Sequence, residues 1–230
     1  MCIRDSYQID HQGGIQTLSE TAEILPFRTV KDYEDWIKRL QGVGPLVDQH
    51  IALLDEAVRE GRTQPRAIME RLPPQLALQV VGSPEQSPFY APFQRFPESI
   101  GAADRARLDA AGRVAIAQSV LPAYKRLQTA FTTRYLPATR SSVGISGTPQ
   151  GADHYRERIA YHTTLKGLTA DEIHAIGLAE VARIRGEMTK IKDQVGFKGT
   201  LQEFFVFLRT DPQFYHKTPQ ELFELSLIHI

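Results

Sequence analysis

Apolar residues recur along most of the chain at steps of three and four, which is the spacing of one face of an α-helix. The clearest stretch runs from Gly151 to Val195 and predicts two helices joined by a short turn, a central helical hairpin. Thr169 and Glu172 have the spacing of a capping box at the start of the second helix, and Gly196 is placed to end it. Behind the cap, the apolar residues of this helix form a single stripe: Ile173, Gly177, Val181, Ile184, Met188, Ile191 and Val195.

The same pattern predicts helices on both sides of this stretch. Thr29 is a cap for a helix that carries Tyr33 and Trp36, and the glycines before Pro45 interrupt it, so residues 29–61 predict another helical hairpin. The longest pattern runs from Ala102 to Tyr135, and Pro122 inside it predicts a kink or a new helix that begins near Ser119. Further caps precede helices at Thr200 and Thr218. The fold class predicted from these patterns is all-α.

Two stretches depart from the helical pattern. Residues 139–150 (TRSSVGISGTPQ) are rich in Ser and Gly, and the alternation of Val143 and Ile145 with small residues predicts one short strand near 142–146. Residues 83–97 combine prolines with Phe89, Tyr90, Phe93 and Phe96. Clustered aromatics can form a recognition surface, or they can anchor a loop to the helices beneath it. We favour the anchored loop, because large aromatic side chains are usually buried.

Composition gives no electrostatic reason to expect a nucleic-acid partner or an anionic membrane surface. Hydrophobic residues make up 42% of the chain and charged residues 23%, as in ordinary globular proteins. Lys+Arg and Asp+Glu are equal at 27 each, so we expect no nucleic-acid partner. No apolar run has the length of a transmembrane helix.

Both ends of the chain look foreign to the rest. MCIRDS (residues 1–6) and SLIHI (residues 226–230) resemble translated sequencing-adapter remnants on metagenomic reading frames. We therefore expect residues 7–225 to be the helical part of a larger domain, in a truncated chain. The only cysteine, Cys2, lies in the first of these ends.

The search for chemistry along the chain yields little. His154 and His162 are eight residues apart, Glu172 and His174 point to different sides of one helix, and no His-Glu-x-x-His motif is present. A zinc site made within this stretch is therefore not expected, and no metal-binding or catalytic residue is assigned. No Gly-x-Ser-x-Gly or Ser-x-x-Lys nucleophile motif is present either. The one cluster near the irregular segment is Tyr155 with Tyr161 and His162, for which core packing is the simpler interpretation.

A set of residues in the central stretch is similar to the bacterial family catalogued as domain of unknown function 885. The residues that carry this resemblance are Gly151 and Tyr155, then His162-Thr163-Thr164, Leu168-Thr169, Glu172-Ile173-His174, Gly177-Leu178, Glu180-Val181 and Arg183-Ile184. Weaker similarities extend it over nearly the whole chain, as at Tyr135-Leu136-Pro137 and Asp211-Pro212.

The resemblance implies a mostly helical, zincin-like metallopeptidase that acts on peptides and is exported or lipid-anchored. Family members carry a His-Glu motif and a further His that hold zinc on a later helix, and we expect this chain to end before it. The chain is then a non-catalytic helical part, with zinc bound only in the intact protein and with Tyr155 as a residue that lines the substrate cleft. The alternative is a helical binding or scaffold module, without enzymatic activity, that holds a partner through the aromatic loop at Phe89 to Phe96.

Overall fold

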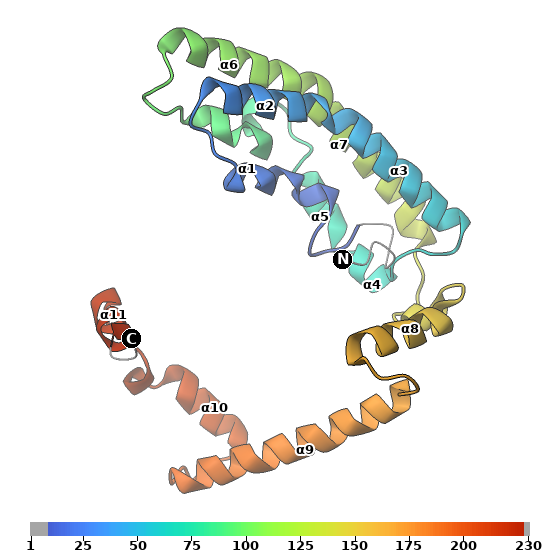
Figure 1. Ribbon diagram of the computed structural model, residues 1–230, viewed down its shortest axis with the longest axis vertical. Helices are drawn as coiled ribbons and strands as arrows, with labels where there is room; N and C mark the ends of the chain where they lie inside the picture. Colours follow the sequence, from blue (N-terminus) through green and yellow to red (C-terminus); the bar gives the residue numbers. More distant parts are fainter. Residues whose placement is uncertain (1–8, 228–230) are drawn as a thin grey trace. The chain divides into compact units, whose positions relative to one another are not determined.

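The computed structural model describes residues 9–227, and this part of the chain is built from helices (Figure 1). It contains no strand within residues 9–227, and only two isolated bridges, Ile9 with Gly14 and Pro65 with Arg140. The all-α prediction is therefore confirmed. The first terminal segment, residues 1–6, lies outside the described residues, as do residues 228–230 of the second. The chain divides into two units, one up to Tyr155 and one from Arg156, which are described separately below.

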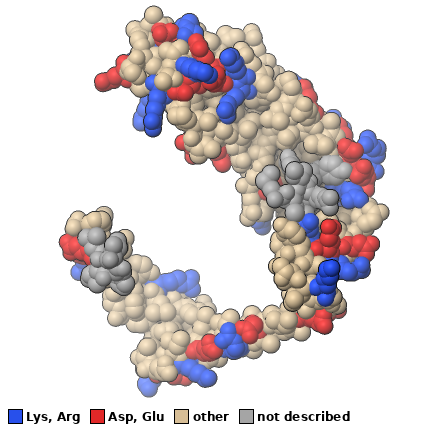
Figure 2. All heavy atoms as spheres, viewed as in Figure 1, with Lys and Arg blue, Asp and Glu red and all other residues tan. Residues whose placement is uncertain are grey.

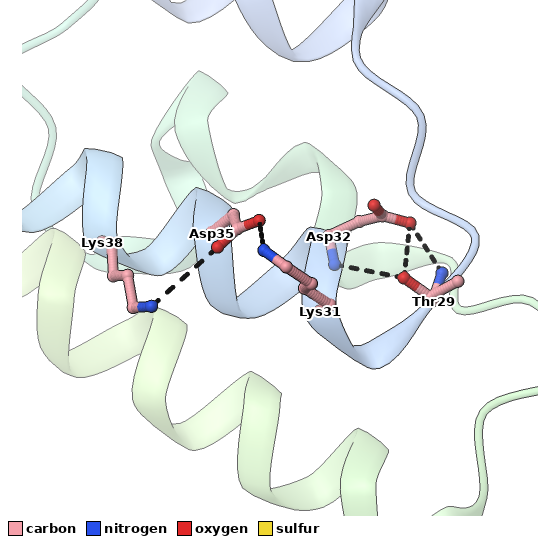
Figure 3. A network of polar contacts seen from close by, with 5 residues as sticks. All are labelled: Thr29, Lys31, Asp32, Asp35 and Lys38. Atoms are coloured by element: carbon pink, nitrogen blue, oxygen red, sulfur yellow. Dashed lines mark hydrogen bonds and ion pairs between the residues drawn. The ribbon is translucent and has the colours of Figure 1, made fainter.

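The first long helix of the first unit is α2 (Val30–Gln41), and its start is fixed by the predicted cap. The Thr29 hydroxyl accepts a hydrogen bond from the Asp32 amide at 3.3 Å, and the Asp32 carboxylate accepts one from the Thr29 amide at 2.7 Å (Figure 3). The Arg28 amide, the Thr29 amide and the Thr29 hydroxyl all donate to the Asp32 carboxylate, which lowers the pKa of Asp32. The ion pairs of Asp35 with Lys31 and Lys38 in the same view are exposed and contribute little to stability.

The pair α2 and α3 (Val43–Arg59) does not form the predicted helical hairpin. The two helices follow each other end to end, α2 packs against α6 and α3 packs against α7 (Figure 1). The prediction is wrong because Gly42, between the helices, has right-handed helical backbone angles (φ −78°, ψ −9°). A chain reversal between two helices needs linking residues with non-helical backbone angles. Where the linking residue itself has helical angles, the second helix continues in nearly the direction of the first.

A second set of consecutive helices runs beside α2 and α3. It consists of α6 (Ala102–Ala115), a π-helical turn (Ile116–Val120), α7 (Leu121–Ala130) and another π-helical turn (Phe131–Tyr135). Pro122 lies in the first turn of α7, and the Leu121 amide bonds to the Ile116 carbonyl five residues back. The predicted new helix near Ser119 is thus present, and it begins through a π turn rather than a break.

The two helical runs are parallel and are joined by matching polar contacts. Arg126 pairs with Asp48 at 2.8 Å and Arg134 pairs with Asp55 at 3.0 Å. The aspartates are seven residues apart and the arginines eight. The second π turn, which begins at Phe131, accounts for this difference, because a π turn holds one more residue than an α turn.

The proline- and aromatic-rich stretch is an anchored loop, as predicted. Its helical turns are of the 3-10 type (Pro84–Gln86 and Pro88–Gln94), and Phe89, Tyr90 and Phe93 are buried. The Trp36 indole N–H donates to the Phe89 carbonyl at 3.2 Å, which ties the loop to α2. These aromatics belong to the core of the first unit, so they form no exposed recognition surface.

Short helices close the other side of this core: a 3-10 turn (Ile15–Glu20), α1 (Thr21–Ile24), α4 (Arg66–Met69) and α5 (Leu72–Ala77). Pro73 lies in the first turn of α5, where a proline is tolerated because its missing N–H would have no partner in the helix. The Tyr124 hydroxyl donates to the Ile15 carbonyl at 2.6 Å, and the Gln79 amide donates to the Gln16 carbonyl at 2.9 Å. Burial raises the pKa of Tyr124.

The predicted strand at 142–146 is absent. Ile145–Gly147 is a 3-10 turn, and Val143 is exposed. Arg140 replaces strand pairing here, since its guanidinium donates to the carbonyls of Thr63 (2.9 Å) and Gly144 (2.7 Å). A strand is stabilised by a series of backbone hydrogen bonds to a neighbouring strand. Here only one isolated bridge is present, between Arg140 and Pro65.

The division between the units falls within α8 (Gly151–Thr163). The second unit continues with α9 (Ala170–Gln194), α10 (Leu201–Thr210) and α11 (Pro219–Leu227). The predicted capping boxes at Thr169 and Thr200 are both formed. Gly196, with φ +75°, follows the end of α9 as expected. Phe197 contacts Phe204 and Phe207 at 5.2 and 5.3 Å between ring centroids, which joins the end of α9 to α10.

The stretch 151–195 contains the two predicted helices but not a packed hairpin. No residue of α9 is buried, and its apolar stripe is exposed along the helix. Among the described residues from Arg156 onward, Ile159 and Phe204 are the buried apolar ones. The periodicity predicted a helix with one apolar face correctly, but the face is not covered by α8.

Candidate functional site

Tyr155, the residue predicted to line a cleft, lies in the first half of α8 with 46% of its surface exposed. It is therefore accessible to a ligand. Tyr161 and His162 contact each other edge to face at 5.1 Å, and the Arg158 guanidinium lies 5.2 Å from the centre of the Tyr161 ring. Six residues of α-helix rotate a side chain by about 240°, so Tyr155 and Tyr161 project in different directions. The structure does not bring the predicted three-residue cluster together.

The loop before α8 is rigidly built. In addition to Thr63 and Gly144, Arg140 bonds the Ser142 carbonyl, and burial lowers the pKa of its guanidinium. A Cβ on Gly151 would lie 1.9 Å from the Ile145 carbonyl oxygen, so no larger residue fits at the start of this helix. Arg62 also donates to the Gln150 side chain at 2.7 Å. These contacts fix the position of the first turn of α8, and with it Tyr155.

Residues 9–227 do not fit a zinc ion. Within this part of the chain no three His, Cys, Asp or Glu side chains come together as metal ligands would. His154 and His162 lie on α8 and His174 lies on α9. His50 in α3 is half-buried, and this burial lowers its pKa.

A shallow groove of about 700 Å³ lies between α3 and α7, and the sequence did not predict it. Its floor is apolar, and Lys125, Arg126, Arg134 and Asp48 supply its charged groups. Its lining consists of Asp48, Ile51, Pro122, Lys125, Arg126, Thr129, Ala130 and Arg134. The only signal in the sequence is the near-equal spacing of the two aspartates and the two arginines, which pair over 78 and 79 positions along the chain. Both arginines are paired with aspartates, so the groove offers mainly an apolar contact surface.

A partly exposed polar network around the buried Tyr90 connects the aromatic loop to α6. The Tyr90 hydroxyl donates to the Asp109 carboxylate and accepts from Arg113 at 2.6 Å, while Arg113 also pairs with Glu85. Burial, followed by the bond to Asp109, raises the pKa of Tyr90 to about 12. The Arg113 guanidinium also lies 5.0 Å from the centre of the Tyr90 ring. All members are mutually satisfied, so this network holds the loop in place.

The charges of the surface are mixed. Figure 2 shows basic and acidic side chains next to one another on the face in view. Among the described residues, no helix is both long enough and apolar enough to cross a membrane.

Comparisons with known proteins agree with this helical architecture. The model of a family described as bacterial protein of unknown function (DUF885) matches residues 4–227. A solved structure, "the putative lipoprotein from Colwellia psychrerythraea", is similar over 93% of this chain with a TM-score of 0.78 and 28% identity. The match covers 37% of that chain, so this chain spans little more than a third of its length. No protein with a curated description matches.

Proposed function

Because the chain belongs to the bacterial family of unknown function DUF885, we propose that it is a helical, non-catalytic part of a longer zinc-dependent peptidase. The observation that carries the proposal is the family match over residues 4–227, together with a relative of which the matched region is 37%. The proposed reaction, zinc-dependent hydrolysis of peptides, rests on the resemblance of the central stretch to the family. Since the described residues do not fit zinc, the metal ligands belong to the rest of the longer polypeptide.

In this proposal the first unit contributes a rigid wall to a peptide-binding cleft. Its core is continuous from Ile9 to Tyr135, and the Arg140 loop places the start of α8. Tyr155 lies directly after that loop and is exposed, so its hydroxyl is available to a peptide backbone. The resemblance, together with the description of the Colwellia protein as a "putative lipoprotein", supports an exported or lipid-anchored location in this proposal.

The alternative of a binding module that holds a partner through the aromatic loop receives no support from the structure. Phe89 and Phe93 are 1% and 4% exposed and take part in the core. A partner could reach them only if the first unit opened.

The proposal is tested by comparing this chain with the full-length Colwellia protein. We expect about one zinc per chain, and peptide hydrolysis that a chelator abolishes, for the longer protein only. Stoichiometric zinc or peptide hydrolysis by the 230-residue chain alone would overturn the proposal. So would a longer protein that contains no metal and cleaves no peptide.

Tyr155 is tested by Tyr155→Phe in the longer polypeptide that contains this chain. Loss of one hydrogen bond to substrate should lower kcat/KM by about tenfold. Tyr161→Phe in the same polypeptide is the matched control and should leave hydrolysis unchanged. Equal kinetics of the two variants would remove Tyr155 from the cleft.

A further inference from the structure

The longest helix of the second unit exposes a continuous apolar face. In α9 the side chains of Val181, Ile184, Met188 and Ile191 follow one another at steps of three and four residues, and Val181 and Ile191 are more than half exposed. The opposite side carries Ala175, Ala182 and Gly186 with charged residues. A helix with this division normally covers its apolar side with another element.

Contacts within α9 do not explain its stability. The Thr169 capping box fixes the start, and Arg183 pairs with Glu180 and Glu187 at 2.7 Å, but all these groups are exposed. Such pairs and caps add little compared with the burial of an apolar face. The apolar stripe is therefore the main unused source of stabilisation in this helix.

A second copy of α9 is one candidate to cover this stripe. In a symmetric pair of helices, charged residues that flank the apolar seam pair across it and set the choice of partner. The acidic flank, Glu180 and Glu187, is already bound to Arg183 in the same helix. The basic flank consists of Arg185 and Lys192, and the half-buried Lys192 pairs with Asp193 at 2.7 Å and donates to the Phe197 carbonyl.

The length of the solved relative indicates a different occupant. The similarity covers 93% of this chain, so most of the second unit must lie within the matched region. It covers only 37% of the relative. We propose that the apolar face of α9 is the docking face for the part of the longer polypeptide that lies outside the matched region. The inference rests on the proposed function only in treating this chain as part of a longer protein.

The test measures how fast single cysteines on α9 react with a maleimide. Val181→Cys and Met188→Cys probe the stripe, and Ala182→Cys on the opposite side is the control, each combined with Cys2→Ser. The equivalent substitutions are made in the full-length Colwellia protein, in a background without other reactive thiols. We expect all three positions to react alike in the 230-residue chain. In the longer protein, the two stripe positions should react at least about tenfold more slowly than the control, because reaction then requires local opening.

Two outcomes would overturn the inference. One is equal maleimide reactivity of the stripe and control cysteines in the longer protein. This measurement does not depend on how the 230-residue chain folds. The other is protection of the stripe in the 230-residue chain that grows with protein concentration, which would make a second copy the occupant. The labelling uses neither metal nor substrate, so a failure of the proposed peptidase activity leaves this test unaffected.

Discussion

Single residues fix several contacts of the first unit, and Gly112 is the clearest example. It lies in α6 against the Phe93 ring, and a Cβ there would come within 2.5–2.8 Å of three ring carbons. Glycine is an unfavourable helix residue, so its presence reflects the space that the buried ring needs. In α9, by contrast, Gly186 has nothing within 4 Å of the place where a Cβ would be.

We predict opposite effects of the same substitution at these two glycines. Gly112→Ala should destabilise the first unit by about 1–3 kcal/mol, because the clash with Phe93 outweighs the gain in helix propensity. Gly186→Ala should leave the first unit unchanged and raise the helicity of α9, by about 0.5–1 kcal/mol in helix stability. Urea unfolding followed by circular dichroism measures both, and a neutral Gly112→Ala would contradict the packing described for Phe93.

Tyr90 should titrate later than an ordinary phenol. Its pKa is raised from 10.0 to about 12, so the folded state holds the proton more tightly than the unfolded state does. The stabilisation is complete below pH 10 and is lost as the pH rises through about 12. In an ultraviolet difference titration, Tyr90→Phe should remove one phenol that ionises near pH 12 and none near pH 10. Loss of a phenol near pH 10 would show that the hydroxyl is not engaged by Asp109.

At the scale of helices, starts were predictable and junctions were not. Thr29, Thr169 and Thr200 each form the cap that their spacing with an acidic residue predicted. Capping is local, so three or four residues contain the whole signal. The end-to-end run of α2 and α3 and the π turns depend on contacts with residues 75 or more positions away, such as Gly44 with Ser119. No local pattern encodes these contacts.

Ser119 connects the bend between α2 and α3 to the first π turn. Its hydroxyl accepts from the Gly44 amide at 3.2 Å and donates to the Gln41 carbonyl at 3.0 Å. Ser119→Ala leaves both groups without this partner in a half-buried place and should cost about 1–2 kcal/mol of unfolding free energy. Thr132→Ala is the control, since that hydroxyl bonds only carbonyls of its own helix, and it should change stability by less than about 0.5 kcal/mol. Equal effects in chemical denaturation would rule out a special role for Ser119.

At the scale of the molecule, the two units differ in how much apolar surface they bury. The continuous core contains residues from Ile9 to Tyr135 only. The sequence could not predict this difference, because α2 and α9 have the same apolar spacing, yet Tyr33 is fully buried and Val181 is 55% exposed. The periodicity of apolar residues predicts that a helix has an apolar face, but that face is buried only where another element packs against it. The candidate site is limited in the same way: Tyr155 is exposed as a ligand contact must be, and its role remains a prediction.

Hydrogen exchange should reveal this asymmetry in the 230-residue chain. Amides of α3 and α7 should exchange only through unfolding of the first unit, whereas amides of α9 should exchange at least about 100-fold faster, since no side chain of α9 is buried. Mass spectrometry of peptic peptides resolves the two regions. Equal protection of α7 and α9 would mean that α9 is covered in the isolated chain.

The second π turn also has a consequence for the geometry beyond it. One residue inserted into an α-helix turns everything that follows by about 100° around the axis. Tyr135 lies at the end of that turn, and its hydroxyl accepts from the Gln64 amide at 3.0 Å, while Arg140, five residues on, reaches Thr63. The additional residue thus sets the direction in which the last side chains of the helix point. Removing it would turn Tyr135 and Arg140 away from their hydrogen-bond partners at residues 63–64.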